Sequence, residues 1–133
     1  MSPDSVAVGK GRRITGIVLI CLGSLVLIAS AGAKLAHVPK VVDELGALGF
    51  GGTRLTLIAI TEVVSALLFL LPLSRSAGLL LVSAYLGGAI ATHVQHGQSF
   101  LQPAMILTLL WLGAWLRNPE VLWSLNQAPA ASR

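Results

Sequence analysis

Ionisable side chains are rare in this sequence, and two of them lie inside long apolar segments. Glu62 falls about eight residues into the segment at 55–73, roughly 12 Å from its start if that segment is helical. His93 falls near the end of the following segment, and His96 comes three residues later. A carboxyl group and an imidazole that face one cavity can act as a general acid–base pair. Glu62 and His93 are therefore the candidate catalytic residues.

Further polar side chains accompany these two at the ends of apolar segments. The candidate substrate-binding residues among them are Lys34, Ser30, Thr92, Tyr85, His96 and Gln98. Lys34 follows Ser30 by one helical turn, and its ammonium group suits an anionic or carbonyl oxygen. Tyr85, Thr92 and His96 recur at helical spacing on one stripe, with His93 at the edge of that stripe.

The apolar segments themselves identify a membrane protein. The 133 residues are 55% hydrophobic and only 11% charged, whereas a soluble domain carries about 25% charged residues. Four apolar segments each have close to the roughly 20 residues that cross a ~30 Å hydrocarbon core as a helix: 14–33, 55–73, 77–94 and 100–116. Helices satisfy their own backbone hydrogen bonds in lipid. The predicted fold is all-α, an integral membrane, antiparallel four-helix bundle.

The first segment has a second interpretation, because basic residues before it and "SAGA" at its end imitate a secretory signal peptide. An apolar region in a signal peptide is typically about 7–15 residues long, and this one is longer. Three further spans follow it. A retained first helix is therefore the favoured interpretation.

The positions of Lys and Arg predict the orientation. With four spans, both tails and the loop between the second and third spans share one side, which holds Lys10, Arg12, Arg13, Arg75, Arg117 and Arg133. The opposite side holds Lys34, Lys40 and Arg54. Because positive charge is enriched on the cytoplasmic side, both termini are expected in the cytoplasm and the protein in the cytoplasmic (inner) membrane.

A single transmembrane domain with two tails is the predicted organisation. Residues 1–13 form a basic cytoplasmic tail, 14–117 the transmembrane domain, and 118–133 a partly disordered cytoplasmic tail. Three tryptophans lie close to the cytoplasmic end of the last span: Trp111, Trp115 and Trp123. A tryptophan belt at the membrane interface is the expected explanation.

The one substantial loop, at 34–53, carries an amphipathic pattern. Its apolar residues can share one helical face: Val38, Val41, Val42, Leu45 and Leu48. We expect a short helix on the outer membrane surface between the first two spans, with Pro39 in its first turn and the glycines at 49–52 ending it. The segment serves either as a packed surface loop or as a lid.

Small residues predict how the spans pack. Ala59, Ser65 and Ala66 share a helical face with Glu62, so this glutamate is expected to point into the bundle. A second set, Ala84, Gly87, Gly88 and Ala91, predicts a helix contact surface on the third span. A glutamate at this depth is expected to be protonated, paired or beside water.

The polar groups concentrate in the outer half of the bundle, which predicts a polar cavity open to the outside and closed below by apolar packing. The inner half is hydrocarbon apart from Cys21, expected to be buried, Ser24 and Thr108. Structural alternatives stay open. Glu62 then holds helices together, His93 bonds a backbone carbonyl, and His96 lies in interfacial water.

Other classes of function are disfavoured. His93 and His96 are spaced so that both could face a metal ion, but no matching ligand cluster occurs elsewhere, so no metal site is predicted. The net charge of +4 comes from basic residues scattered along the chain with no patch, so no nucleic-acid partner is predicted. The motifs of soluble nucleotide-binding and hydrolytic enzymes are absent.

Three stretches resemble the DoxX-like family of small four-helix membrane proteins: "SAGAKLAHVPKVVDELGALGF" (30–50), "IAITEVVSALLFLLP" (58–72) and "LGGAIATHVQHG" (86–97). The family pattern maps to Gly32 and Lys34, to Leu48 and Gly49, to Glu62, and to Ile90–His93. The resemblance covers about 14–117. Some relatives resemble subunits of quinone-linked sulfur oxidation and others belong to redox-stress complexes. With Cys21 as the single cysteine, this chain has no intrachain thiol pair.

Two functional hypotheses follow. In the first, the chain acts on or binds a lipophilic small molecule or quinone by Glu/His proton transfer, as an isomerase or an oxidoreductase. In the second, it is a non-catalytic subunit or assembly factor of a redox complex, and the polar cluster is structural. No cofactor is predicted beyond a quinone as a candidate ligand. The expected partners are membrane lipids, the lipophilic molecule, and either a redox subunit or further copies of the chain.

Overall fold

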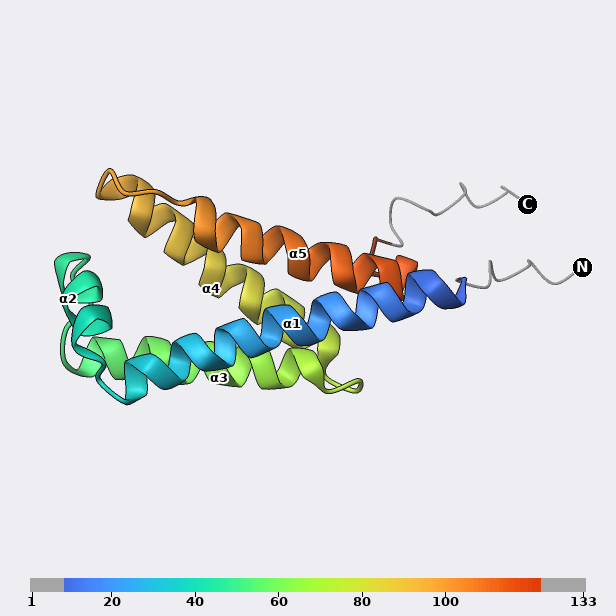
Figure 1. Ribbon diagram of the computed structural model, residues 1–133, viewed down its shortest axis with the longest axis horizontal. Coiled ribbons are helices and arrows are strands. Elements are labelled where there is room, and N and C mark those ends of the chain that lie inside the picture. The colour runs from blue at the N-terminus through green and yellow to red at the C-terminus, as the bar shows by residue number, and fades with distance from the viewer. Residues whose placement is uncertain (1–8, 123–133) are drawn as a thin grey trace, which may run out of the picture.

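The computed structural model describes residues 9–122, and the regular elements in this range are all helices (Figure 1). Its elements are α1 (Lys10–Leu35), α2 (Pro39–Ala47), α3 (Thr53–Leu70), α4 (Arg75–Gln95), α5 (Leu101–Arg117) and the short 3-10 helix η1 (Pro119–Leu122). The four long helices match the four apolar segments, and α2 is the short helix expected between the first two. The all-α bundle predicted from the sequence is confirmed.

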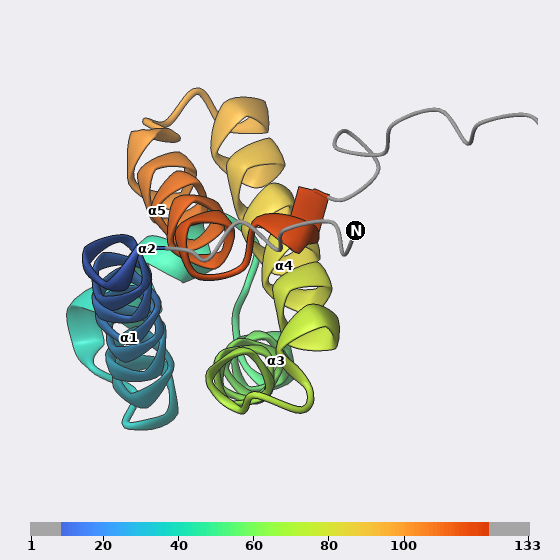
Figure 2. The ribbon, with the colours of Figure 1, turned by 90° about the vertical axis from the view of Figure 1, so that its right-hand side faces the viewer.

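The four long helices form a ring around the bundle axis. Helices α1 and α4 each pack against α3 and α5, and Figure 2 shows the ring end-on. Consecutive long helices run in opposite directions, so neighbours are antiparallel (Figure 1). Helix α2 lies across one end of the bundle, which we call the α2 end. Helix α1 begins and α5 ends at the opposite end, which we call the terminal end.

Proline and side-chain caps set several helix boundaries. Helix α2 begins at Pro39. Proline has no backbone N–H, and this costs nothing in the first turn because N–H groups there have no acceptor within the helix. Helix α3 ends because Leu71, which precedes Pro72, takes an extended conformation. In the turn to α4, Ser74 Oγ donates to a carbonyl of the last turn of α3 at 2.9 Å, and Arg75 donates to two more at 3.2 Å. These bonds hold α3 and α4 as a tight hairpin.

The loops at the α2 end turn sharply through left-handed backbone conformations. Gly97 has a φ of 65°, and the next N–H, that of Gln98, bonds the His93 carbonyl at 2.8 Å. This closing bond is the Schellman arrangement that ends many helices. His37 adopts a φ of 52° after α1, a conformation that glycine takes at lower cost. These turns place the ends of the long helices beneath α2.

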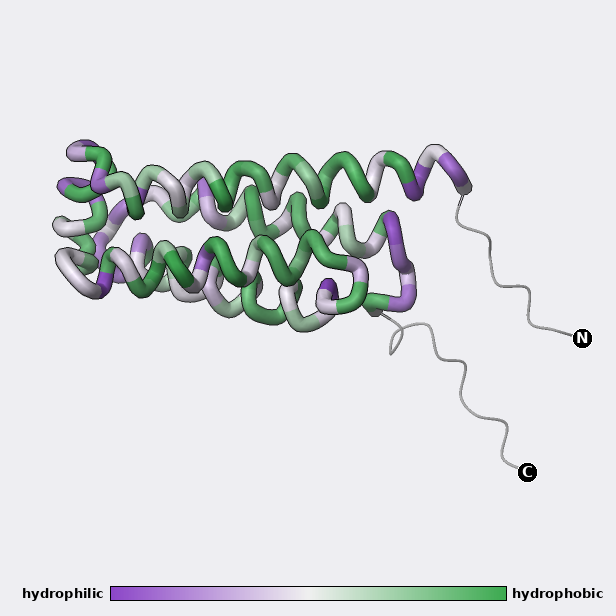
Figure 3. The backbone as a smooth tube through the Cα atoms, turned by 90° about the horizontal axis from the view of Figure 1, so that it is seen from below, coloured by the Kyte–Doolittle hydropathy of each residue, from purple (hydrophilic) through white to green (hydrophobic). Residues whose placement is uncertain are grey.

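The outer faces of the helices are apolar, as expected of a multi-pass membrane protein. Helices α1, α3 and α4 are each long and apolar enough to cross a bilayer, and α5, with 17 residues, reaches the lower end of the spanning range. Large apolar side chains such as Leu22, Leu25, Leu57 and Leu80 are exposed on these helices. Figure 3 shows hydrophobic residues along the middle of the bundle and hydrophilic ones at its two ends.

The apolar core extends from the terminal end to the middle of the bundle. Its buried residues come from all four long helices: Ile20, Leu27, Ala66, Phe69, Leu79, Val82, Leu86, Leu110 and Ala114. Phe69, Val82 and Leu110 have no exposed surface. The predicted closure of the bundle by apolar packing therefore lies on the side away from α2.

Glycines bring the helices closest in the half nearer the terminal end. A Cβ at Gly16 would lie 2.8 Å from the Gly113 carbonyl oxygen, so α1 and α5 touch through their backbones. A Cβ at Gly78 would collide with the backbone of Phe69 in α3. The contact surface predicted on α4 is wrong, because Ala84, Gly88 and Ala91 are exposed and a Cβ at Gly87 or Gly88 would meet nothing within 4 Å. Small residues mark a helix contact only when a partner helix faces them.

Two further expectations need correction: a buried Cys21 and an interfacial Trp111. The expectations for Trp123 and for the domain boundaries stay open. Cys21 is exposed on the outer face of α1 rather than buried. Trp111 is held within the bundle, because its indole N–H donates to Ser83 Oγ of α4 at 2.9 Å. Trp115 is partly exposed beside Arg12, in keeping with an interfacial position, while Trp123 lies outside the described residues. Helix α1 already includes Lys10 to Arg13, and the proposed domain boundaries remain predictions.

Replacing Gly78 with Ala should destabilise the bundle by about 1–3 kcal/mol, because the new methyl group forces α4 away from the α3 backbone. The matched control is Gly87→Ala in the same helix. It meets open space and should be neutral or stabilising by up to about 1 kcal/mol. Chemical unfolding of the purified variants in detergent micelles measures both changes. Equal stability of the two variants would contradict the close approach of α3 and α4 at Gly78.

Candidate functional site

A buried ion pair joins α1 to α3 beneath the α2 end. Lys34 Nζ lies 2.6 Å from Glu62 Oε2, and the two residues are only 6% and 2% exposed. Lys34 Nζ also donates to Ser30 Oγ at 2.6 Å, one helical turn earlier. Of the three states expected for a glutamate at this depth, the structure shows the paired one. The pairing is with a lysine 28 positions away, and no hydrogen bond joins Glu62 to His93 within residues 9–122.

The opposite directions of α1 and α3 explain why these two side chains meet. Side chains on a helix lean toward its N-terminus. Lys34 stands at the α2 end of α1, so its side chain leans down into the bundle. Glu62 stands deeper on α3, which runs the other way, so its side chain leans up toward the α2 end. The two residues therefore meet although their positions along the helices differ.

A pocket of about 260 Å³ opens beside this pair. All five α-helices contribute to its wall, with Ser30 and Lys34 from α1, Glu62 from α3, and Tyr85 and His93 from α4. The Tyr85 hydroxyl interacts with the Glu62 carboxylate. Five polar side chains from three antiparallel helices thus face one cavity.

His93 has a defined orientation in this pocket. Its Nδ1 lies 2.7 Å from the carbonyl oxygen of Ala89, one turn earlier on α4. A carbonyl only accepts hydrogen bonds, so Nδ1 carries a proton and donates it to this oxygen, and Nε2 is the ring nitrogen that remains. The bond to a backbone carbonyl anticipated for a structural histidine is present, and it leaves the second ring nitrogen without a protein partner among residues 9–122.

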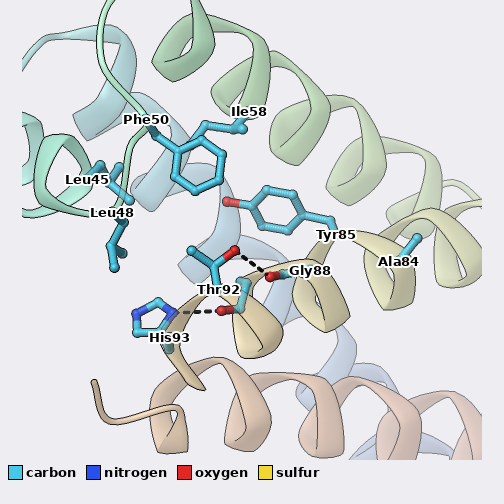
Figure 4. Close-up of a pocket in the computed structure, with 10 residues that line it drawn as sticks. Leu45, Leu48, Phe50, Ile58, Ala84, Tyr85, Gly88, Thr92 and His93 are labelled. Atoms are coloured by element: carbon cyan, nitrogen blue, oxygen red, sulfur yellow. Dashed lines mark hydrogen bonds between the residues drawn. The ribbon is translucent and has the colours of Figure 1, made fainter. Parts of the chain in front are cut away.

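A second, more apolar pocket of about 230 Å³ adjoins the first (Figure 4). Leu45, Tyr85, Ala89 and His93 line both pockets. Figure 4 shows the Tyr85 hydroxyl pointing toward Phe50, with Thr92 and His93 on the wall below. The two pockets are adjacent along α4, and Tyr85 and His93 belong to the wall of both.

Helix α2 covers the pockets from outside. Val41, Glu44 and Leu45 of α2 line the first pocket, and Leu45 and the following Leu48 line the second. Asp43 on the opposite face is exposed. Val41, Leu45 and Leu48 of the apolar face predicted from the sequence therefore face the pockets and form their roof, whereas Val38 is exposed.

The predicted site residues divide into three groups. Glu62, His93, Lys34, Ser30 and Tyr85 line the first pocket. Thr92 lines only the second pocket, with its hydroxyl bonded to the Gly88 carbonyl at 2.9 Å. His96 and Gln98 are exposed near the end of α4 and line neither pocket. The roles of all eight residues remain predictions.

Sequence reasoning missed the direct Lys34–Glu62 pairing and two pocket residues, Glu44 and Gln102. A buried carboxylate requires a counter-charge, and Lys34 is the one basic residue at the α2 end of α1. The pairing of Lys34 with Glu62 could therefore have been predicted from the sequence. Residues 9–122 contain no group of three His, Cys, Asp or Glu side chains that could hold a metal ion.

These observations define the class: a small multi-pass membrane protein with a polar pocket enclosed within a helical bundle. Residues 18–115 match the model of the DoxX-like family, and the chain belongs to that family. Comparisons with curated proteins and with solved structures returned no match. The family assignment carries the fold and the membrane location, and any activity must be argued from the pocket.

Removing one partner of the ion pair should be much worse than removing both. Lys34→Met or Glu62→Gln leaves a buried charge without its partner, which costs about 3–5 kcal/mol, whereas the double variant should recover most of that loss. The exposed pair Lys40–Glu44, at 3.9 Å, is the matched control, and the same substitutions there should change stability by about 1 kcal/mol or less. Unfolding in detergent micelles reports the coupling. If the changes in the free energy of unfolding caused by Lys34→Met and Glu62→Gln simply add in the double variant, the two side chains do not stabilise each other.

Proposed function

We propose that the chain binds a lipophilic molecule with a carbonyl or hydroxyl oxygen, such as a quinone, in the pocket beside Lys34 and Glu62, and that His93 exchanges a proton with it. The observation that supports this best is a buried ion pair facing a cavity instead of being enclosed by packed side chains. The family assignment is compatible with the proposal and names no substrate.

The hydrogen-bonding capacity of the pocket favours an uncharged ligand with a polar oxygen. Lys34 and Glu62 neutralise each other, and Glu44 on the pocket wall lies 3.9 Å from Lys40, so the pocket has little net charge for a ligand to balance. The ammonium group has three N–H donors, of which Ser30 and Glu62 take two. The third N–H is left to donate to a ligand carbonyl oxygen.

The adjoining pocket suits the apolar part of such a molecule. Leu45, Leu48, Phe50 and Ile58 supply most of its apolar wall. A ligand whose head contacts Lys34 and whose ring or chain extends past Tyr85 buries apolar surface there, which supplies binding energy. Mostly apolar walls with a few convergent polar groups are typical of small-molecule sites.

His93 is the group best placed to move a proton. Its Nε2 can accept a proton from a ligand hydroxyl or an activated C–H bond and can return it elsewhere on the same molecule. Such a return is an isomerisation and needs no other reactant. Reduction of a quinone at the same position requires electrons, which a partner redox subunit would supply, and oxidation of a quinol releases electrons, which that subunit would accept.

Binding of a decyl-substituted benzoquinone to the purified protein tests the proposal. His93→Ala should weaken binding of the reduced quinol form by about tenfold, because a ligand hydroxyl loses Nε2 as its hydrogen-bond acceptor while the fold is kept. His96→Ala is the matched control, since the same residue type stands one turn further along, exposed and outside both pockets. Titration in micelles gives both affinities. Unchanged affinity in the His93 variant, or an equal loss in both, would exclude this site.

The second candidate function is that of a non-catalytic subunit or assembly factor, and the ion pair itself favours it. Lys34 bonds both Ser30 and Glu62, so it is a well-satisfied link between α1 and α3. In this case the pair holds the bundle in the shape that a redox partner recognises, and the pocket has no ligand.

Exchanging the two charges separates these candidates. Lys34→Glu combined with Glu62→Lys restores opposite charges, so stability should return to within about 1–2 kcal/mol of the original, well above either single variant. Quinone binding should stay weak, because the N–H donor is moved from α1 to α3. A swapped protein that regains both stability and binding would show that only the link between the helices matters.

We also infer that the chain resides in the cytoplasmic (inner) membrane with both termini in the cytoplasm, since the terminal end carries the larger share of Arg and Lys. The pocket then opens on the outer side. Reporter fusions at the C-terminus test this orientation: a cytoplasmic reporter should be active there and an exported one inactive.

A further inference from the structure

A separate polar pocket lies at the terminal end of the bundle, opposite α2, and three arginines line it. The pocket has a volume of about 300 Å³, and Arg13 of α1, Arg75 of α4 and Arg117 of α5 face it. These residues are far apart in the sequence, where no basic patch was visible. The fold gathers them because α1 and α4 begin, and α5 ends, at the same end of the bundle.

No acidic side chain among residues 9–122 balances the positive charge of this pocket. None of its lining residues is acidic, and none of the three arginines forms an ion pair within residues 9–122. Glu120 follows α5 closely but does not line the pocket. Arg75 and Arg117 are close enough for their charges to repel each other. Such an arrangement is unfavourable when empty and becomes favourable when an anion is bound between the guanidinium groups.

One arginine is fixed in place, and a neighbour is excluded from the pocket. Arg75 Nε and one terminal nitrogen donate to the carbonyls of Phe69 and Leu70, each at 3.2 Å, which orients the half-buried guanidinium group. Arg12, by contrast, stacks on Trp115 at 4.5 Å and does not line the pocket. A guanidinium group offers a planar fork of donors that matches the oxygens of a phosphate.

We propose that this arginine pocket binds a phosphate group, presented by the headgroup of an anionic phospholipid. The pocket lies where membrane-spanning helices end, the level at which lipid phosphates are found. Its remaining wall includes the apolar side chains of Pro72 and Val121, which suit the glycerol end of a lipid. Basic pockets between transmembrane helices commonly hold anionic headgroups. A free phosphate ion offers the same oxygens, so the experiment must separate the two sources.

Thermal unfolding of the full chain in dodecyl maltoside, with added phosphatidylglycerol, phosphatidylcholine or inorganic phosphate, tests this site. Phosphatidylglycerol should raise the unfolding temperature in a saturable way, and phosphatidylcholine should not. Arg13→Gln combined with Arg117→Gln should weaken the apparent affinity about tenfold or more, as lost charge-assisted bonds predict. Without lipid, this variant should be at least as stable as the original, because the repulsion is relieved. Arg54→Gln, at the α2 end, is the control and should keep the full response.

Each result decides the proposal. A saturable response to inorganic phosphate alone that also requires Arg13 and Arg117 supports the phosphate site and assigns it to a free anion. Equal responses to phosphatidylglycerol and phosphatidylcholine, or no response to any of the three, overturn it. A double variant that responds like the original also overturns it. If the double variant does not fold, the single Arg13→Gln change in an exposed side chain provides the same comparison.

Discussion

The contact between the Lys34 ammonium and the Glu62 carboxylate places the strongest constraint on this structure. Either charge alone would be costly inside an apolar bundle, so each residue requires the other in its place. That requirement fixes the position of α1 against α3. Helix α2 follows the end of α1, and its residues Val41, Glu44 and Leu45 line the same pocket as the pair.

Packing divides the bundle into a closed half and a hollow half. Near the terminal end, Gly16 and Gly113 let α1 and α5 touch, and Gly78 lets α4 touch α3, so large apolar side chains fill the centre. Toward the α2 end, Gly87 and Gly88 face open space, and α4 and α5 separate from α1 and α3 (Figure 1). Close packing at one end provides the rigidity with which the other end holds a cavity and its polar side chains in position.

Much of the fold was predictable because each apolar segment carries its own signal. Segment length and hydropathy gave the four long helices, and Pro39 with the apolar face of α2 gave the short one. The inward direction of Glu62 followed from Ala59, Ser65 and Ala66, which are all buried. The contact face of α4 was not predictable in this way. Small residues both pack helices and line cavities, and the sequence of one helix does not say which partner faces it.

The sequence by itself determined that this chain is a membrane-spanning helical bundle with its rare polar groups near one end, because hydropathy and helical periodicity are local properties. Only the tertiary structure decided which of those groups meet. It paired Glu62 with Lys34 rather than with His93, and it left His96 outside the pocket. It also brought Arg13, Arg75 and Arg117 around one pocket. Such contacts depend on the relative stagger and rotation of packed helices, which arise from the fit of all their faces together.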